Sequence, residues 1–297
     1  MPEVQRLIVL GAIVLFGSLA LGAYQAPAPA APKVLDIVKL KDNLYVITSS
    51  SPTPRELFSG GNVAVFITDA GVTLVDSKLA GWGQVLIDKV KSVTNKPVTT
   101  IINTHTHGDH TGNNDAFGKV DVVAHENTRA NMAKMDAFKG KEPFLPGKIY
   151  KDKLTIGRGQ DQIDLHYFGS AHTNGDTVVV FPALRVVHMG DMFAWKDGPL
   201  CDRNNGGSCV SYPKTLAGVM AGIKNVDIVI PGHSPMMTMK DVQGYQQFMT
   251  DLVAAAQAAR GAGKTVDDAF AAFDIGKYAG YKNERVKAAM QAVFDEK

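Results

Sequence analysis

The sequence predicts an α/β fold in which two β-sheets pack against each other and helices cover the outside. Two observations support this prediction. Apolar, β-branched runs bounded by turn residues alternate with segments of helical spacing. Strand-rich stretches followed by helices occur once in each half of the chain, and such sheets are stable when both faces are covered by further layers.

The first half of the chain contains four strand regions and two helices. Two of the strand regions are interrupted by the turn sequences KDN and DAG, which predict paired strands. The first helix is recognised by apolar residues at helical spacing and by Pro97 just beyond its end. The predicted elements are strands at 34–49, 62–78, 98–103 and 121–126 and helices at 81–95 and 127–138.

The second half repeats this order. An alternating strand is followed by two runs that predict paired strands with ALR at the turn, and a helix with an early proline precedes a buried strand that ends near Pro231. The remaining chain has the spacing of three helices. The predicted elements are strands at 161–169, 177–182, 185–191 and 226–234 and helices at 212–224, 239–263, 265–273 and 283–297.

The N-terminal residues differ in composition from the rest of the chain. Arg6 precedes an uncharged apolar run at 7–23, and an Ala/Pro-rich stretch at 24–33 follows it. This order is typical of a secretory signal peptide. The run also approaches the roughly 17 residues of the shortest membrane-spanning helices, so an uncleaved membrane anchor is the alternative. The sequence therefore predicts a periplasmic or secreted protein, anchored to the membrane in the second case.

The composition limits the classes of partner. Hydrophobic residues make up 45% of the 297 residues, enough for a large buried core. The formal net charge is +2, and no cluster of Lys or Arg stands out. Because nucleic-acid-binding domains carry basic patches, we expect a small-molecule substrate and no nucleic acid. Nothing in the sequence indicates an oligomeric state.

Histidine and aspartate residues follow four of the predicted strands, each time with glycine nearby. Loops at one edge of a layered fold can bring such groups together, and imidazole and carboxylate are ordinary ligands of Zn²⁺ and similar ions. A dinuclear site needs about three protein ligands for each ion and a shared bridging group. The candidate metal ligands are His105, His107, Asp109, His110, His172, Asp191 and His233.

These motifs resemble the metallo-β-lactamase superfamily: H-x-H-x-D-H, a distant AHT, a distant GD-x-F and a final PGH, over roughly residues 35–235. The resemblance implies a four-layer αββα sandwich with a dinuclear centre, usually of zinc, so two Zn²⁺ per chain are expected. Carried over residue by residue, it assigns one ion to His105, His107 and His172. It assigns the other ion to Asp109, His110 and His233, and Asp191 bridges both ions or completes the second.

The family's shared chemistry is hydrolysis by a metal-activated water that attacks a carbonyl, which needs no serine or cysteine nucleophile. No Gly-x-Ser-x-Gly elbow is present. Asp109 and Asp191 are the candidate catalytic residues. Asp76, at the end of VTLVDSK, matches a family aspartate that holds a ligand histidine in one tautomer. The alternative for Asp76 is an ordinary turn carboxylate.

The strand pair AHTNGDTVVVFP and VVHMGDMF resembles the exported class B β-lactamases, which favours cleavage of a cyclic amide. Two departures favour a thioester or lactone hydrolase instead. Asp191 stands where those enzymes have cysteine or serine, and His110 stands where many have arginine; both resemble glyoxalase II and the lactonases. The C-terminal region nevertheless lacks a convincing copy of the basic glutathione-binding pattern of glyoxalase II.

Two weaker alternatives share the fold. A mononuclear iron dioxygenase would differ in its bound metal. An RNA-processing nuclease shares the histidine motif but would need a basic surface and a cytosolic location.

Three further predictions complete the sequence analysis. Cys201 and Cys209 enclose a flexible Gly/Asn loop and either form a disulfide or remain as two thiols. His125, His166 and His188 are expected to have structural roles. The chain is divided into a signal peptide or anchor at 1–23, a linker at 24–33, a metallo-β-lactamase-fold domain at 34–235 and a C-terminal helical region at 236–297 packed on that domain.

Overall fold

A seven-stranded sheet is built from the N-terminal half of the chain, in a computed structural model that describes residues 33–48 and 57–296. Its strand order follows the sequence, antiparallel from β1 to β4 and parallel from β4 to β7. The strands are β1 (Asp36–Lys41), β2 (Leu44–Thr48), β3 (Val63–Thr68), β4 (Gly71–Val75), β5 (Val98–Ile102), β6 (Asp121–His125) and β7 (Lys148–Tyr150).

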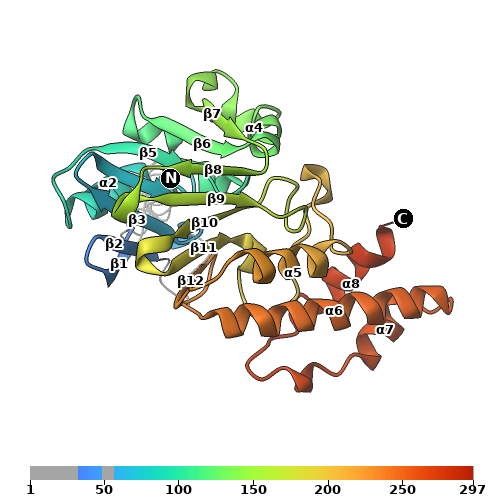
Figure 1. Cartoon of the computed structure of the whole chain (residues 1–297). Helices are drawn as coiled ribbons and strands as arrows, with labels where there is room; N and C mark the ends of the chain where they lie inside the picture. The colour runs from blue at the N-terminus through green and yellow to red at the C-terminus, as the bar shows by residue number, and fades with distance from the viewer. Residues whose placement is uncertain (1–32, 49–56, 297) are drawn as a thin grey trace, which may run out of the picture. The chain divides into compact units, whose positions relative to one another are not determined.

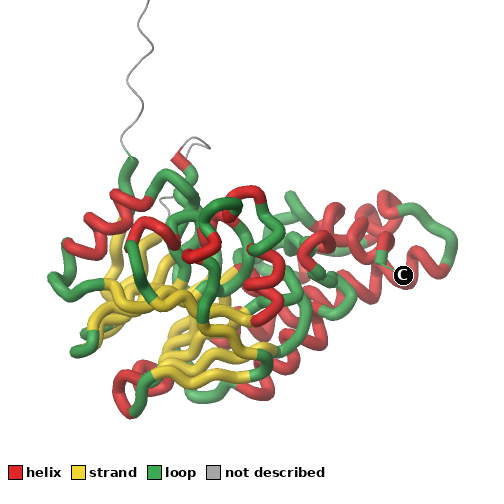
Figure 2. The backbone as a smooth tube through the Cα atoms, turned by 90° about the horizontal axis from the view of Figure 1, so that it is seen from above, coloured by secondary structure: helices red, strands yellow, loops and turns green. Residues whose placement is uncertain are grey.

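A second sheet of five strands comes from the C-terminal half, in the order β12-β11-β10-β9-β8. Its first pair, β12 and β11, is parallel and the other pairs are antiparallel. The strands are β8 (Lys153–Ile156), β9 (Ile163–Tyr167), β10 (Thr177–Phe181), β11 (Val186–Gly190) and β12 (Ile228–Pro231). Figure 2 shows the two groups of strands facing each other.

The core between the sheets follows from the alternation of side chains along each strand. Phe66 of β3 meets Phe181 of β10 with ring centroids 5.1 Å apart, and Val179 and Ile230 add to the same buried cluster. The neighbouring side chains, such as Val178, point to the opposite face and join another cluster. Because successive residues of a strand face opposite ways, both faces of this apolar sheet need a cover.

Helices cover both outer faces. The helix α2 (Gly83–Lys91) buries Leu86 and Val90 against the first sheet. On the second sheet, α5 (Tyr212–Gly222) and α6 (Met239–Gly261) bury apolar side chains and lie side by side (Figure 1). The order helix, sheet, sheet, helix confirms the predicted αββα sandwich.

The C-terminal helices pack on α5 through α6. The last two are α7 (Val266–Ala272) and α8 (Val286–Asp295), and both contact α6. A capping box begins α6: Thr238 accepts the backbone N–H of its third residue, and the carboxylate of Asp241 accepts from Thr238 N at 2.9 Å. Among the helices of the described ranges, none combines the length and apolar character that a membrane span requires.

Two strands of the structure, β7 and β8, were not predicted from the sequence, and one predicted helix is shorter than expected. β7 (KIY) and β8 (KLTI) have three and four residues, lie at the edges of their sheets and are mostly exposed, so they give only a weak strand signal in the sequence. The helix predicted for 127–138 ends earlier, because α4 (Glu126–Met132) is followed by a separate 3₁₀ turn at Asp136–Phe138. The segments predicted as signal peptide and most of the linker lie outside the described residues.

Candidate metal centre

Five strands end at one edge of the sandwich, and the predicted site residues follow them. In the first sheet β4 and β5 are parallel, and in the second β9, β11 and β12 run in one direction. Asp76 follows β4, the His/Asp motif follows β5 and continues through the short helix α3 (Gly108–Thr111), and single residues follow the other three. The latter are His172 after β9, Asp191 after β11 and His233 after β12.

The structure brings the seven candidate ligands together. His105, His107 and His172 form one triad, and Asp109, His110 and His233 form a second, with the ligand atoms of each triad within 4.8 Å of one another. Asp191 lies between the triads. Its Oδ2 is 3.6 Å from His172 Nε2 and 3.2 Å from His233 Nε2, so one carboxylate reaches both groups.

Asp76 orients two of these histidines, His110 directly and His105 through Thr104. Its side chain is fully buried and its backbone has a φ of 70°. His110 Nδ1 donates to Asp76 Oδ2 at 2.7 Å, and Thr104 Oγ1 donates to the same oxygen at 2.8 Å. The Thr104 hydroxyl has thereby used its proton, so it accepts from His105 Nδ1 at 3.0 Å. Both rings therefore present Nε2 to the centre of the site.

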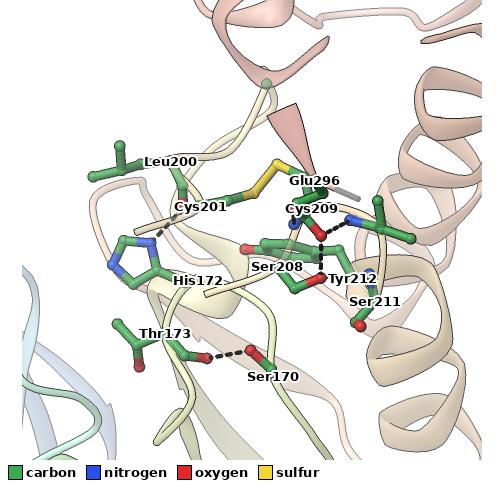
Figure 3. The surroundings of a disulfide bond; sticks show 12 residues. Ser170, His172, Thr173, Leu200, Cys201, Ser208, Cys209, Ser211, Tyr212 and Glu296 are labelled. Carbon is green, nitrogen blue, oxygen red and sulfur yellow. Dashed lines mark hydrogen bonds between the residues drawn. A yellow bond between two sulfur atoms is a disulfide. The ribbon is translucent and has the colours of Figure 1, made fainter. Parts of the chain in front are cut away.

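The other two rings of the first triad are held by a different loop. His107 Nε2 donates to Asp202 Oδ2 at 2.7 Å, and His172 Nδ1 donates to the carbonyl of Leu200 at 2.7 Å (Figure 3). With those protons committed, neutral rings direct the lone pairs of His107 Nδ1 and His172 Nε2 at each other across 2.8 Å. Two facing lone pairs repel unless a cation lies near both.

These observations test whether a metal fits the site. His105 Nε2 is buried and has no hydrogen-bond partner among the described residues. An unpaired buried nitrogen costs about 1–3 kcal/mol, and a metal ion would satisfy it. The donor set of imidazole nitrogens and carboxylate oxygens is the set that Zn²⁺ accepts. The residues present therefore fit the metal that the family usually binds.

The histidines of the two triads differ in their pKa values. Burial lowers the pKa of His172 to about 4 and the pKa of His105 well below its ordinary value, so both rings are neutral at neutral pH. Burial also disfavours the charged form of His233, but Asp191 and Asp109 outweigh it and raise the pKa of His233 to about 9. Metal binding at the second triad must therefore compete with a proton.

The carboxylates are ionised in the same environment. Burial raises the pKa of Asp109, yet His110 and His233 lower it to about 2. Burial opposes ionisation of Asp191 as well, and the same two histidines hold its pKa well below the ordinary value. Both groups carry negative charge at neutral pH, which suits them to hold cations.

Two glycines allow the ligands to approach the backbone closely. A Cβ added at Gly61 would lie 2.2 Å from His110 Cε1, and one added at Gly232 would lie 1.9 Å from Asp191 Oδ1. Any side chain at either position would displace a candidate ligand. Glycine is therefore required at both positions by the site itself.

The remaining predictions for this region have clear outcomes. His125 accepts from Asn127 N at the start of α4, and His188 Nε2 donates to the Asn62 carbonyl at 3.1 Å, so both have structural partners. Cys201 and Cys209 form a disulfide. Asp202, which accepts a hydrogen bond from His107, was not among the predicted site residues; its position beside Cys201 in a Gly/Asn loop was its only signal in the sequence.

The two-sheet sandwich carries imidazole and carboxylate groups at one edge, in an arrangement that could hold metal ions. The chain belongs to the metallo-beta-lactamase superfamily, whose family model matches residues 58–241. This match confirms the predicted family and supports a hydrolase.

Individual relatives agree with the family. The metallo-beta-lactamase type 2 of Elizabethkingia meningoseptica is 27% identical over 237 residues, covering 76% of this chain and 89% of that protein. Metallo-beta-lactamase IND-1 of Chryseobacterium indologenes is 25% identical over 213 residues, covering 69% of this chain and 85% of that protein. A solved metallo-beta-lactamase from Pontibacter korlensis shares the fold with a TM-score of 0.62 at 20% identity, over 73% of this chain and 99% of that one.

Proposed function

We propose that the chain is an exported, dinuclear zinc hydrolase that opens a cyclic amide of the β-lactam class. The position of Asp191 Oδ2, within 3.6 Å of a ring nitrogen of each triad, carries the proposal of two ions. The curated relatives, named as metallo-beta-lactamases, support the substrate class. When bound, the ions supply positive charge that lowers the pKa of water and polarises the carbonyl.

The side chains of this site have the charges and lone pairs needed to bind these ions. Asp109 and Asp191 are ionised and offset part of the positive charge, while His105 and His172 are neutral and offer lone pairs. Asp76 orients His110 through Nδ1. A site whose rings are already oriented needs little reorganisation when negative charge develops on the substrate.

A cleft of about 950 Å³ beside the second triad provides room for substrate. His233 and Trp195 line it, and so does Arg285 from the C-terminal region. The Arg285 guanidinium lies over the Trp195 ring at 4.4 Å and has no ion-pair partner among the described residues. The lining also includes the carboxylates of Asp36, Asp197 and Glu284. The part of the cleft at Trp195 and Arg285 is therefore the part that suits an apolar ring bearing a carboxylate.

Arg285→Gln tests this use of the cleft. We expect KM for a β-lactam carrying a carboxylate to rise about threefold to tenfold with little change in kcat, since a single charge-assisted contact at an exposed site is lost. Steady-state kinetics measure both constants. Lys287→Gln is the matched control, because Lys287 pairs with Asp267 and does not line the cleft. An unchanged KM for Arg285→Gln would remove the anion-binding role.

A thioester or lactone hydrolase is the second candidate function. Asp191 and His110 favour it, since both resemble the ligand set of glyoxalase II and the lactonases. Purified, zinc-loaded protein should be assayed against a cephalosporin, a lactone and a thioester. The first proposal predicts the highest kcat/KM for the cephalosporin, and a higher value for either other substrate would overturn it.

Metal analysis of protein purified without chelator tests the dinuclear zinc proposal. Two equivalents of zinc per chain are expected, because the candidate ligands divide into two triads with Asp191 between them. A reproducible single equivalent of iron would favour the dioxygenase alternative. One equivalent of zinc, with His110 and His233 unliganded, would contradict the two-ion assignment.

Export is proposed from Arg6, the apolar run at 7–23 and the disulfide, because disulfides persist in oxidising compartments. Cell fractionation with N-terminal sequencing tests it. A mature form that starts after the apolar run is expected. Full-length protein in the cytosol would refute export, whereas full-length protein in the membrane would indicate an anchor.

A further inference from the structure

The loop closed by Cys201 and Cys209 lies against the first triad. The disulfide encloses residues 202–208, and its cysteine Cα atoms are 5.5 Å apart. Figure 3 shows the bridge next to the ring of His172, with Leu200 immediately before it. This loop is therefore a neighbour of the metal centre, although none of its own residues is a candidate ligand.

One side chain of the loop determines how His107 faces the site. Asp202 Oδ2 accepts from His107 Nε2 at 2.7 Å, and this leaves Nδ1 to face His172. The carboxylate is itself fixed by the loop, since it accepts from Asn205 Nδ2 at 2.6 Å and from Asn204 N at 3.0 Å. The orientation of His107 thus depends on the local fold of the loop.

The backbone of the loop holds His172 in the same way. The Leu200 carbonyl accepts from His172 Nδ1 at 2.7 Å, and Asp202 N donates to the His172 carbonyl at 2.8 Å. Ser208 N donates to the Ala171 carbonyl at 2.9 Å. Both ends of the loop are bonded to the segment that carries this histidine.

The far end of the chain fastens the loop. The Glu296 carboxylate accepts from Cys209 N at 2.6 Å and from Ser208 Oγ at 2.7 Å (Figure 3). The disulfide joins the two ends of the loop, and Glu296, the residue after α8, bonds the loop to the helical layer. The loop therefore has the rigidity needed to place two imidazole rings.

We propose that this disulfide-closed loop positions His107 and His172 of the first triad, with Asp202 as the residue that keeps the proton of His107 on Nε2. The inference rests on the proposed role of His107 and His172 as ligands of one metal ion. Loss of the Asp202 carboxylate or of the disulfide weakens that ion's binding and leaves the second triad intact. Partners behind ligand histidines are worth about 10–100-fold in metal affinity.

The experiment measures the zinc affinity of the mature protein and its variants by competition with a chromophoric chelator. We expect Asp202→Ala to lower the affinity of one of the two sites about 10–100-fold. The double variant Cys201→Ser, Cys209→Ser should lower the affinity of the same site. Arg203→Ala is the matched control in the same loop, because its side chain is half exposed and only approaches Asp295 at 4.0 Å.

A second readout does not depend on zinc. In the metal-free protein, ¹⁵N chemical shifts of the imidazoles report which ring nitrogens are protonated, and His107 Nε2 should carry a proton that it donates to Asp202. In Asp202→Ala this preference should disappear, while His110 should keep its proton on Nδ1, held by Asp76. Wild-type zinc affinity and an unchanged His107 tautomer in Asp202→Ala would overturn the inference.

The outcomes also separate this inference from the proposed function. If the unaltered protein binds fewer than two zinc ions, the proposed function fails, and the tautomer still decides whether Asp202 positions His107. If the unaltered protein binds two ions and the cysteine variant loses only thermal stability, the loop merely stabilises the fold. That result would overturn its role at the site.

Discussion

Asp191→Asn is expected to lower turnover at least tenfold and to weaken binding of the second metal. The carboxylate reaches a ring nitrogen of each triad, at 3.6 Å for His172 and 3.2 Å for His233. If two dications bind as proposed, an amide at this position removes one negative charge between them and so increases their mutual repulsion. Steady-state kinetics and elemental analysis measure the two effects. Asp227→Asn is the control, an exposed aspartate that precedes β12 at the opposite end of the strand.

Asp191→Cys is the informative companion, because it restores the ligand type of one β-lactamase subclass. A β-lactam-cleaving protein should retain or gain activity with cysteine at this position. A lactone or thioester hydrolase should be impaired as in Asp191→Asn. Unchanged kinetics and metal content in Asp191→Asn would show that the aspartate is only structural, and the bridging assignment would fall.

Asp76→Ala is expected to weaken the proposed second zinc site about 10–100-fold, to disturb His105 of the first triad through Thr104, and to destabilise the fold. The buried carboxylate accepts from His110 Nδ1, Thr104 N and Thr104 Oγ1 at 2.7–2.8 Å. Its removal leaves buried donors unpaired, at about 1–3 kcal/mol each. Chelator competition and denaturant unfolding of the metal-free protein measure the effects on metal binding and on stability separately.

The control for Asp76→Ala is Asp69→Ala, an exposed carboxylate after β3 that pairs with Lys96 at 3.0 Å. Such surface pairs contribute about 0–1 kcal/mol, so little change is expected. If Asp76→Ala binds two zinc ions as tightly as the unaltered protein, Asp76 is a turn residue and does not orient His110. The sequence left these two roles open, and the hydrogen bond to His110 favours the first.

Sequence periodicity predicted the strands that build the core, because these strands are apolar on one or both faces. The runs that became β3, β4, β10 and β11 are almost continuously buried. The edge strands β7 and β8 escaped the prediction, since three or four residues at a sheet edge are too few to establish an alternating pattern. Their positions could be learned only from the fold.

The candidate site divides in a similar way. His105, His107, Asp109 and His110 are local in sequence, so their spacing alone indicated a common role. Asp202 acts on His107 from 95 residues away, and a single aspartate in a Gly/Asn loop has no distinguishing pattern. A residue that orients a ligand needs to be near it in space but not in sequence, so no local motif identifies it.

Each proposed triad takes ligands from both sheets. The loop after β5 of the first sheet provides most of them, and His172 and His233 come from the second. A bound ion would therefore cross-link the two sheets at this edge of the sandwich. A ligand present at a thousand times its Kd adds about 4 kcal/mol to the stability of the folded state. Zinc starvation should consequently let the two sheets separate at this edge and make the chain easier to digest with protease.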